Sequence, residues 1–211
     1  MKNLILKSAA ILFVFTLSLG TAYAQKVKGN GKMVNKTRNV GNFDGVGVSG
    51  SFDVFLVAGN EGKLDINVEE NLEPYLITEV NNGKLKIRWK KGTSIRTSKT
   101  TKITVHFKNI NSLAMSGSGD IISKDIIKGN SLDMAVAGSG DIKVEMDVQK
   151  AKSAISGSGD IELSGKSTEF EAAVSGSGDV DAYDLKTEKA ELKIAGSGSI
   201  GISVEKEIIA R

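Results

Sequence analysis

The chain has 211 residues, a formal net charge of +3, one proline, one histidine and no cysteine. The lack of cysteine excludes a disulfide framework and thiolate chemistry, and a single His106 excludes a zinc cluster of Cys and His ligands. These residue types predict no cofactor.

The first 24 residues have the pattern of a secretory signal peptide. Lys2 and Lys7 begin the segment, an apolar run covers residues 9–19, and the small-x-small sequence AYA at 22–24 is a cleavage site. The apolar run is too short to span a membrane as a helix. We therefore predict cleavage before Gln25 and export to the periplasm, the cell surface or the extracellular space. The mature chain then keeps 26 basic and 25 acidic residues and has no transmembrane segment.

An N-terminal extension over residues 25–42 is predicted to precede a single domain over 43–211. Apolar and polar residues alternate over 63–68, 84–89 and 102–107, which is the pattern of half-buried strands.

Turn and helix signals separate these strands. GNEG at 59–62 and NNG at 81–83 are turn sequences, and Asn71 is predicted to be the N-cap of a short helix that starts at Leu72-Glu73-Pro74. Residues 43–110 are therefore expected to be irregular, with long excursions between strands.

A five-residue motif recurs in the second half of the chain. It starts at Gly117, Gly138, Gly157, Gly176 and Gly196, with spacings of 21, 19, 19 and 20 residues. The sequence is GSGDI three times, then GSGDV and GSGSI. A period near twenty residues is typical of proteins built from stacked turns of chain.

Apolar residues around each motif occupy alternate positions, as Leu132, Met134 and Val136 do before the second copy, and this period of two predicts strands. We therefore predict an all-β fold, a single-stranded parallel β-helix (β-solenoid) with about 20 residues per coil. Irregular coils are expected over residues 43–110 and regular coils over 111–211.

The same alternation places both glycines of each motif on the inward face, where the walls approach closely and the backbone bends. The predicted structural turn glycines are Gly117, Gly119, Gly138, Gly140, Gly157, Gly159, Gly176, Gly178, Gly196 and Gly198. A variant motif, GSFDV at 50–54, has Phe52 in place of the second glycine and is expected to help close the core at the first coil.

The residue after the second glycine faces outward and is Asp in four of the five motifs. The expected row is Asp53, Asp120, Asp141, Asp160 and Asp179, and Ser199 interrupts it. One interpretation is turn chemistry, in which each carboxylate accepts backbone N–H groups. The alternative is Ca²⁺ bound between neighbouring carboxylates. Turn chemistry is favoured, because the motif of Ca²⁺-binding β-helices has a different sequence and a nine-residue period.

Charge is unevenly distributed along the chain. Residues 84–119 contain nine basic and no acidic residues, whereas 120–211 contain 11 basic and 17 acidic residues. The basic segment is either an ordinary solvated hairpin and loop or a patch for anionic glycans, lipopolysaccharide or phosphate groups. The candidate anion patch consists of Lys84, Lys86, Arg88, Lys90, Lys91 and Arg96. A nucleic-acid partner is not expected, since few aromatic residues accompany these cations.

Other chemistry-bearing residues point away from catalysis. His106 alternates with apolar Val105 and is predicted to lie on the surface, while Trp89 and Tyr75 are expected to cover the irregular coils rather than to stack on sugars. A uniform row of Asp lacks the two unlike carboxyl environments that glycoside hydrolysis needs. The chain is therefore predicted not to be an enzyme.

The chain ends with half a coil after Ile200. Either this half-turn caps the last coil or the sequence is truncated relative to a longer stack. An uncovered last strand is an exposed pairing edge, through which the protein would associate with itself.

The sequence resembles one family of proteins. FDGV at 43–46, SGSFDV at 49–54, Asn71-Leu72 and the SGSGDI copies are similar to the putative auto-transporter adhesin, head-GIN domain family of the bacterial cell envelope, over about residues 39–205. The resemblance implies an exported β-solenoid without a catalytic motif. Ser199 and the half-coil at the end depart from the family pattern.

Three functions follow from these observations. The leading one is an exported, non-catalytic adhesin or surface-binding module, whose partner would be a glycan or a component of the envelope or matrix. The second is a periplasmic structural or stress-related protein without a dedicated ligand. The third is a carbohydrate-active β-helix enzyme, a reading that rests on analogy between folds alone.

Overall fold

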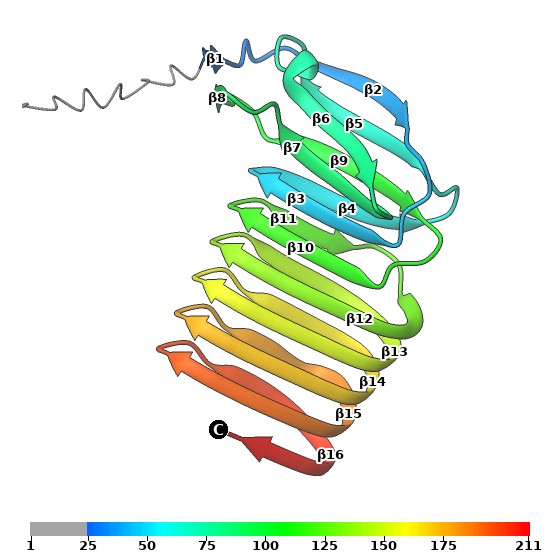
Figure 1. The fold of residues 1–211 in the computed structure, drawn as a ribbon, viewed down its shortest axis with the longest axis vertical. Helices are drawn as coiled ribbons and strands as arrows, with labels where there is room; N and C mark the ends of the chain where they lie inside the picture. Colours follow the sequence, from blue (N-terminus) through cyan, green and yellow to red (C-terminus); the bar gives the residue numbers. More distant parts are fainter. Residues whose placement is uncertain (1–24) are drawn as a thin grey trace, which may run out of the picture.

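The computed structural model describes residues 25–211, which form an all-β fold with one short 3₁₀-helix (Figure 1). The predicted signal peptide, residues 1–24, lies outside the described residues. The elements are β1 (Gln25–Lys28), β2 (Met33–Asn39), β3 (Gly45–Gly50), β4 (Phe52–Ala58), β5 (Lys63–Glu69), η1 (Glu73–Tyr75), β6 (Leu76–Asn81), β7 (Lys84–Trp89), β8 (Thr93–Arg96), β9 (Thr101–Phe107), β10 (Ser112–Gly117), β11 (Asp120–Ser123), β12 (Ile127–Gly138), β13 (Asp141–Gly157), β14 (Ile161–Gly176), β15 (Val180–Gly196) and β16 (Ile200–Ala210).

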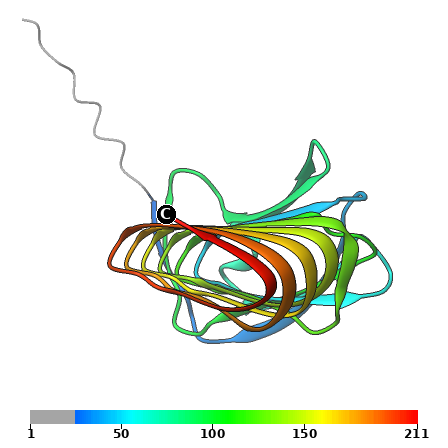
Figure 2. The same ribbon diagram turned by 90° about the horizontal axis from the view of Figure 1, so that it is seen from below.

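Fourteen strands form one sheet, and β1 and β8 form a separate parallel pair. The order of the large sheet is β2-β5-β9-β4-β11-β13-β12-β10-β3-β7-β6, and β14, β15 and β16 follow on from β13. Figure 2, which views the molecule along its long axis, shows the sheet curling around a narrow interior. The result is a curled half-barrel with two facing walls.

The prediction of a single-stranded parallel β-helix is wrong, because strand directions are mixed in this sheet. β2 pairs antiparallel with β5, β5 with β9, and β6 with β7. The order in space also departs from the order in sequence, since β3 lies between β7 and β10. Alternation of apolar and polar residues identifies the buried face of a strand but is the same in parallel and antiparallel pairs. The sequence pattern therefore could not reveal the mixed directions.

Local turn chemistry explains one of the antiparallel pairs. Asn82 and Gly83 connect β6 to β7 with φ angles of 51° and 74°, and two residues of positive φ define a tight hairpin whose twist suits antiparallel strands. The predicted helix is only the 3₁₀ turn η1, whose N-cap is Leu72 without a side-chain cap. Asn71 instead accepts a hydrogen bond from the Asn30 N–H and donates one to the Lys28 carbonyl.

Strands β10 and β12–β16 pair in parallel, with matching registers at the GSG motifs. Gly117 pairs with Gly138, Gly138 with Gly157, Gly157 with Gly176, and Gly176 with Gly196. The spacings of the motif along the sequence are therefore the spacings of aligned residues in neighbouring strands.

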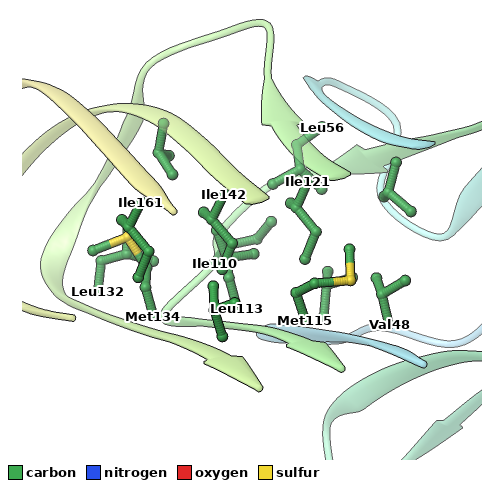
Figure 3. Close-up of a cluster of buried hydrophobic side chains, with 14 of the residues drawn as sticks. Val48, Leu56, Ile110, Leu113, Met115, Ile121, Leu132, Met134, Ile142 and Ile161 are labelled. Atoms are coloured by element: carbon green, nitrogen blue, oxygen red, sulfur yellow. The ribbon is translucent and has the colours of Figure 1, made fainter. Parts of the chain in front are cut away.

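The core lies between the two walls and is filled by apolar side chains from both (Figure 3). Met115 and Met134 come from one wall, Ile121 and Ile142 come from the other, and each is at most 2% exposed. Burial of apolar area of this kind is the main stabilising contribution to the fold.

The two glycines of each motif share one requirement, because a Cβ on either would clash with the backbone of the preceding strand. The first also has positive φ, for example 133° at Gly138, a conformation that residues with a Cβ rarely adopt. The second has no unusual φ, but a Cβ on Gly140 would lie 2.1 Å from the Gly119 carbonyl oxygen, and one on Gly159 would lie 2.1 Å from the Gly140 carbonyl oxygen. The second glycine therefore permits close approach of successive strands.

The two ends of the molecule differ. At the N-terminal end, Phe52 is fully buried with its ring centroid 4.8 Å from that of Trp89, and antiparallel strands cover the sheet. At the other end, β16 pairs with β15 alone among the described strands. Ile194, which alternation places inward, is 43% exposed, and Ile208 is 53% exposed.

Candidate functional site

The Asp row forms one edge of the molecule, immediately after the GSG turns. Asp141 accepts a hydrogen bond from the backbone N–H of Asp160 (2.8 Å), and Asp160 accepts one from Asp179 (2.8 Å). The last copy continues this pattern, because Asp179 accepts hydrogen bonds from both the N–H and the hydroxyl of Ser199. Each of these carboxylates thus binds the backbone of the next strand, which is the chemistry that the turn interpretation requires.

Asp120 differs from the rest of the row. Burial raises the pKa of its carboxyl group above the usual value, and the neighbouring carboxylates of Asp141 and Asp53 raise it further, although a hydrogen bond from the Asp141 backbone N–H offsets part of this rise. Repulsion between like charges at this spacing favours the protonated form of the most buried member. Within residues 25–211, no three His, Asp or Glu side chains are grouped closely enough to hold a metal ion. A Ca²⁺ site in the row therefore gains no support from this geometry.

The structure divides the predicted anion patch into two groups. Lys84 forms an ion pair with Asp44 (3.0 Å) and also donates to Asn111 and Ser112. The Lys84 ammonium is the main reason why the pKa of Asp44 lies below its usual value. Arg88 forms an ion pair with Glu79 (3.0 Å). These two cations of β7 have acidic partners. Lys86 of the same strand is exposed and, like Lys90, Lys91 and Arg96 around β8, forms no ion pair within the described chain.

Two lysines that the sequence analysis did not include join the second group. β1 pairs with β8 so that Lys26 aligns with Ser94, Val27 with Ile95, and Lys28 with Arg96. Val27 and Ile95 are partly buried against the core, so the aligned Lys26, Lys28, Ser94 and Arg96 project from the opposite, exposed face. We call Lys26, Lys28, Lys90, Lys91, Arg96 and Lys99 the basic end.

A buried carboxylate holds the basic end together. Glu69 is fully buried and accepts hydrogen bonds from the backbone N–H groups of Gly31, Ser98 and Lys99. Burial alone would raise the pKa of Glu69, but these N–H donors outweigh it and leave the pKa below the usual value. The Ser98 hydroxyl also donates to the Gly29 carbonyl (3.0 Å). Glu69 thus fixes the segment after β1 against the segment after β8.

His106 lies in a small polar cluster on β9. Its Nε2 is 2.9 Å from Asp65, which also pairs with Lys63 (2.8 Å) and accepts a hydrogen bond from the Thr37 hydroxyl. The Lys63 ammonium and then His106 lower the pKa of Asp65 to about 2. The side chain of His106 is 20% exposed, so it is only partly buried beside solvated charges. A carboxylate held ionised by a lysine is typical of a structural ion pair.

A second surface extends over the outer side of β10 and β12–β15. We define the flat face as two aligned rows of small residues on these strands. The rows are Ala114, Ala135, Ala154 and Ala173, which Lys193 continues on β15, and Ser116, Ala137, Ser156, Ser175 and Ala195. Shallow hollows of about 450 Å³ and about 380 Å³ lie over this face. Because these side chains are small, this part of the surface is nearly flat and the sheet beneath it is accessible to a partner.

Two rows of charged side chains lie beside the flat face. Lys150, Glu169, Lys189 and Glu207 alternate in sign, whereas the row of Asp133, Lys152, Glu171 and Glu191 ends with two acids. Lys150 pairs with Glu169 (2.9 Å), and Lys152 with Glu171 (2.9 Å), across aligned positions of β13 and β14. Hydrogen bonds and charge attraction within these pairs lower the pKa of Glu169 and raise that of Lys152. Together the two rows line a hollow of about 370 Å³. These ion pairs neutralise Lys150, Glu169, Lys152 and Glu171 locally, and they leave both positive and negative groups exposed at the surface.

The fold and these surfaces are those of an all-β protein in which the Asp row, the basic end and the charged rows lie on outer faces rather than in an enclosed cleft. A family comparison agrees with this class and makes it specific: residues 42–211 match the model of the "Putative auto-transporter adhesin, head GIN domain" family. The chain belongs to this family, as the resemblance of its motifs implied. No curated protein is similar to the chain.

Solved structures share the fold. A putative adhesin from Bacteroides fragilis has 21% sequence identity and a TM-score of 0.80, over 87% of this chain and 86% of its own. A putative lipid binding protein from Parabacteroides distasonis has 26% identity and a TM-score of 0.67, over 88% and 97%. A putative adhesin from Parabacteroides merdae has 21% identity and a TM-score of 0.66, over 89% and 97%.

Proposed function

We propose that the protein is an exported, non-catalytic binding module of the bacterial cell envelope that acts as an adhesin. Membership of an adhesin family supports export and a surface role. In the described part of the chain, no helix has the length and apolarity to span a membrane. The observation that carries the proposal is the flat face with its bordering charge rows, because it offers a level, continuous contact area.

The geometry of the acidic residues supports a non-catalytic role. Asp141, Asp160 and Asp179 repeat the same hydrogen bond along the row, so their environments are alike. Acid–base catalysis by two carboxyl groups needs unlike environments that separate their pKa values, and only Asp120, whose pKa is raised, departs from this uniformity. The three hydrogen-bonded carboxylates therefore serve the scaffold in this proposal.

The interior gives no support to lipid storage as the function, although one similar structure is described as a putative lipid binding protein. Between the walls the apolar side chains are in contact, as Figure 3 shows for Leu113, Met115 and Ile121. A ligand would therefore bind to the outside.

The first experiment is protease treatment of intact cells, with a periplasmic protein as control. Cleavage of this chain while the control survives is the result expected for surface display. Protection of both proteins would overturn the adhesin proposal and favour a periplasmic structural role.

The second experiment tests the flat face with glycan and matrix-protein arrays. Ala154→Arg places a long charge in the middle of the face and should abolish any binding that the wild type shows. Lys166→Gln, on an exposed position away from the face, is the control and should bind as the wild type does. Equal binding by wild type and Ala154→Arg would show that the flat face is not the contact site.

A further inference from the structure

Charge is segregated along the long axis of the molecule. Residues 25–119 contain 15 basic and 8 acidic residues, a net charge of +7, and residues 120–211 have a net charge of −6. Figure 1 places β1 and β8 at one end of the long axis and the C-terminus at the other. The described chain is therefore a long electric dipole whose positive pole contains the basic end.

The cations of the basic end lie together and form no ion pair, although the buried Glu69 carboxylate lies beside them and attracts Lys99. Lys28 and Arg96 align directly across β1 and β8, and like charges in this position repel each other. Neither these two nor Lys26, Lys90, Lys91 and Lys99 form an ion pair with a carboxylate of residues 25–211. Lys32, Lys63 and Lys84 elsewhere at the same pole each have one, whereas Lys36, Lys86, Lys102 and Lys108 form none with the described residues. The basic end is therefore distinguished by the number of cations that its two short strands and their flanking segments bring together.

The arrangement is also held rigidly. The buried Glu69 carboxylate ties the segments that follow β1 and β8 together, and the Asn71 side chain bonds to the Lys28 carbonyl. Apolar Val27 and Ile95 face the core. Because side chains alternate along a strand, the residues on either side of them face outward. A preorganised group of cations binds an anionic surface without first losing the conformational freedom of its backbone.

We propose that the basic end docks the protein on an anionic lipid membrane. A planar array of phosphate headgroups matches a small, exposed β-ribbon on which Lys26, Lys28 and Arg96 share one face, and each such cation contributes to membrane attraction within a Debye length. The negative pole is repelled by the same surface, so the molecule stands with its C-terminal end away from the lipid. The inference goes beyond the proposed function, and it places the flat face at a distance from the cell's own membrane.

The test measures sedimentation of the purified full chain with vesicles of phosphatidylglycerol and phosphatidylcholine, at low and at physiological salt. Lys26→Gln, Lys28→Gln and Arg96→Gln together should weaken binding roughly 100-fold at low salt. Lys128→Gln, Lys166→Gln and Lys186→Gln together remove the same charge from exposed positions of the other half. This control should change binding by less than about threefold. Every variant keeps residues 1–24, so binding by that segment is common to all.

Two further measurements separate docking from other causes. The chain has no cysteine, so a fluorophore on Ser94→Cys or on Ser203→Cys reports one position alone. Contact with lipid should change the emission of the label at 94, in the basic end, and leave that at 203, in β16, unchanged. Melting curves confirm that all variants fold.

Four outcomes would overturn the proposal. They are equal loss of binding by the two triple variants, a loss by the Lys26, Lys28 and Arg96 variant on pure phosphatidylcholine equal to its loss on the anionic vesicles, equal lipid contact at both labels, and binding to dextran sulfate that outcompetes the vesicles. The last result would assign the basic end to anionic polysaccharides. None of these results depends on whether the flat face binds a partner, so failure here leaves the proposed function standing.

Discussion

The N-terminal end and the stack of β10–β16 solve the same problem in different ways. In the stack, the chain crosses from one wall to the other at each Gly-Ser-Gly sequence, and the next strand packs directly against that crossing. At the N-terminal end, β7 and β9 occupy the two walls, but residues 90–100 make a long excursion between them. Phe52 replaces the second glycine beneath this excursion and packs on Trp89.

The comparison indicates that the second glycine of the motif is needed where the backbone of a neighbouring strand packs closely against the turn. A glycine permits that approach in the stack, while an aromatic side chain fills the space at the end. Both solutions bury the same interior, so substitutions at equivalent positions should have different mechanisms and different controls.

The largest effect is expected at the N-terminal end. Phe52→Ala removes a fully buried ring that contacts Trp89, and it should lower the free energy of unfolding by about 3–5 kcal/mol. The measurement is denaturant unfolding at neutral pH. Phe55→Ala is the matched control on the same strand, because Phe55 is half-buried and contacts Lys124; it should cost about 1 kcal/mol or less. Equal losses at both positions would show that Phe52 does not close the core.

In the stack, Gly159→Val should lower the free energy of unfolding by about 3 kcal/mol, because its Cβ would lie 2.1 Å from the Gly140 carbonyl oxygen. Thermal and denaturant melts check this value. The first control is Ser158→Ala, an exposed position where a change within about 0.5 kcal/mol is expected.

The second control for Gly159 compares the two regions directly. Gly47 lies in β3, and a Cβ there would be 3.9 Å from its nearest neighbour, the Leu85 carbonyl oxygen. Gly47→Ala should therefore be tolerated or slightly stabilising, since alanine restricts the unfolded chain. If Gly47→Ala cost as much as Gly159→Val, close packing of strands would not be the reason for the motif.

The anchor of the basic end should contribute less. Glu69→Gln removes the negative charge and replaces one acceptor oxygen by an NH₂ group, which cannot accept from the backbone N–H groups that it faces, and it should cost about 1–3 kcal/mol at pH 7. Because the pKa of Glu69 is lowered in the folded state, its contribution is present above the unfolded value near 4.5 and is lost as the pH falls through the folded value. Unfolding measured across this range should therefore show the two proteins converging in acid.

Glu70→Gln is the control for Glu69. Glu70 is exposed and pairs with Lys32 (3.0 Å), so its loss should change the unfolding free energy by less than about 1 kcal/mol. A difference between wild type and Glu69→Gln that does not depend on pH would mean that the negative charge of Glu69 is not what holds the segments.

The sequence predicted the buried faces and the all-β class well, because alternation reports burial directly. Leu132, Met134 and Val136 are buried as alternation requires. Alternation failed to predict strand direction, because turn geometry decides direction. It also failed to predict the exposure of Ile194, because the pattern identifies the inward face of a strand but not whether a further described strand covers it. The sequence also failed on the N-cap at Asn71, whose side chain is used by a segment forty residues away.

The candidate sites were only partly accessible from sequence. The basic segment was visible as a run of cations, but Lys26 and Lys28 join Arg96 only through the β1–β8 pairing. The K-x-K pattern around apolar Val27 was the available signal for an exposed basic strand. The same pairing information was needed to see that Lys84 and Arg88 have acidic partners. The flat face depends on the alignment of alanines across strands, which the motif spacings contained.

The smallest effect separates the two interpretations of the Asp row. Burial and the carboxylates of Asp141 and Asp53 raise the pKa of Asp120 in the folded state, so the folded protein gains stability as the pH falls toward that value. Asp120→Asn mimics the protonated form and should leave the unfolding free energy unchanged or raise it by about 0.5 kcal/mol at pH 7. Asp160→Asn should instead lower it slightly, because Asp160 accepts the Asp179 N–H.

Calorimetric titration with Ca²⁺ completes this test. If the row is turn chemistry, the wild type should release no heat of binding, and Ca²⁺ should not change the stability order of the two variants. If cations bridge the row, Asp120 is the carboxylate with the most to gain, because a bound ion would remove the repulsion from Asp53 and Asp141. Heat that disappears in Asp120→Asn, together with a loss of stability in Ca²⁺, would therefore reverse the assignment and make the row a binding site.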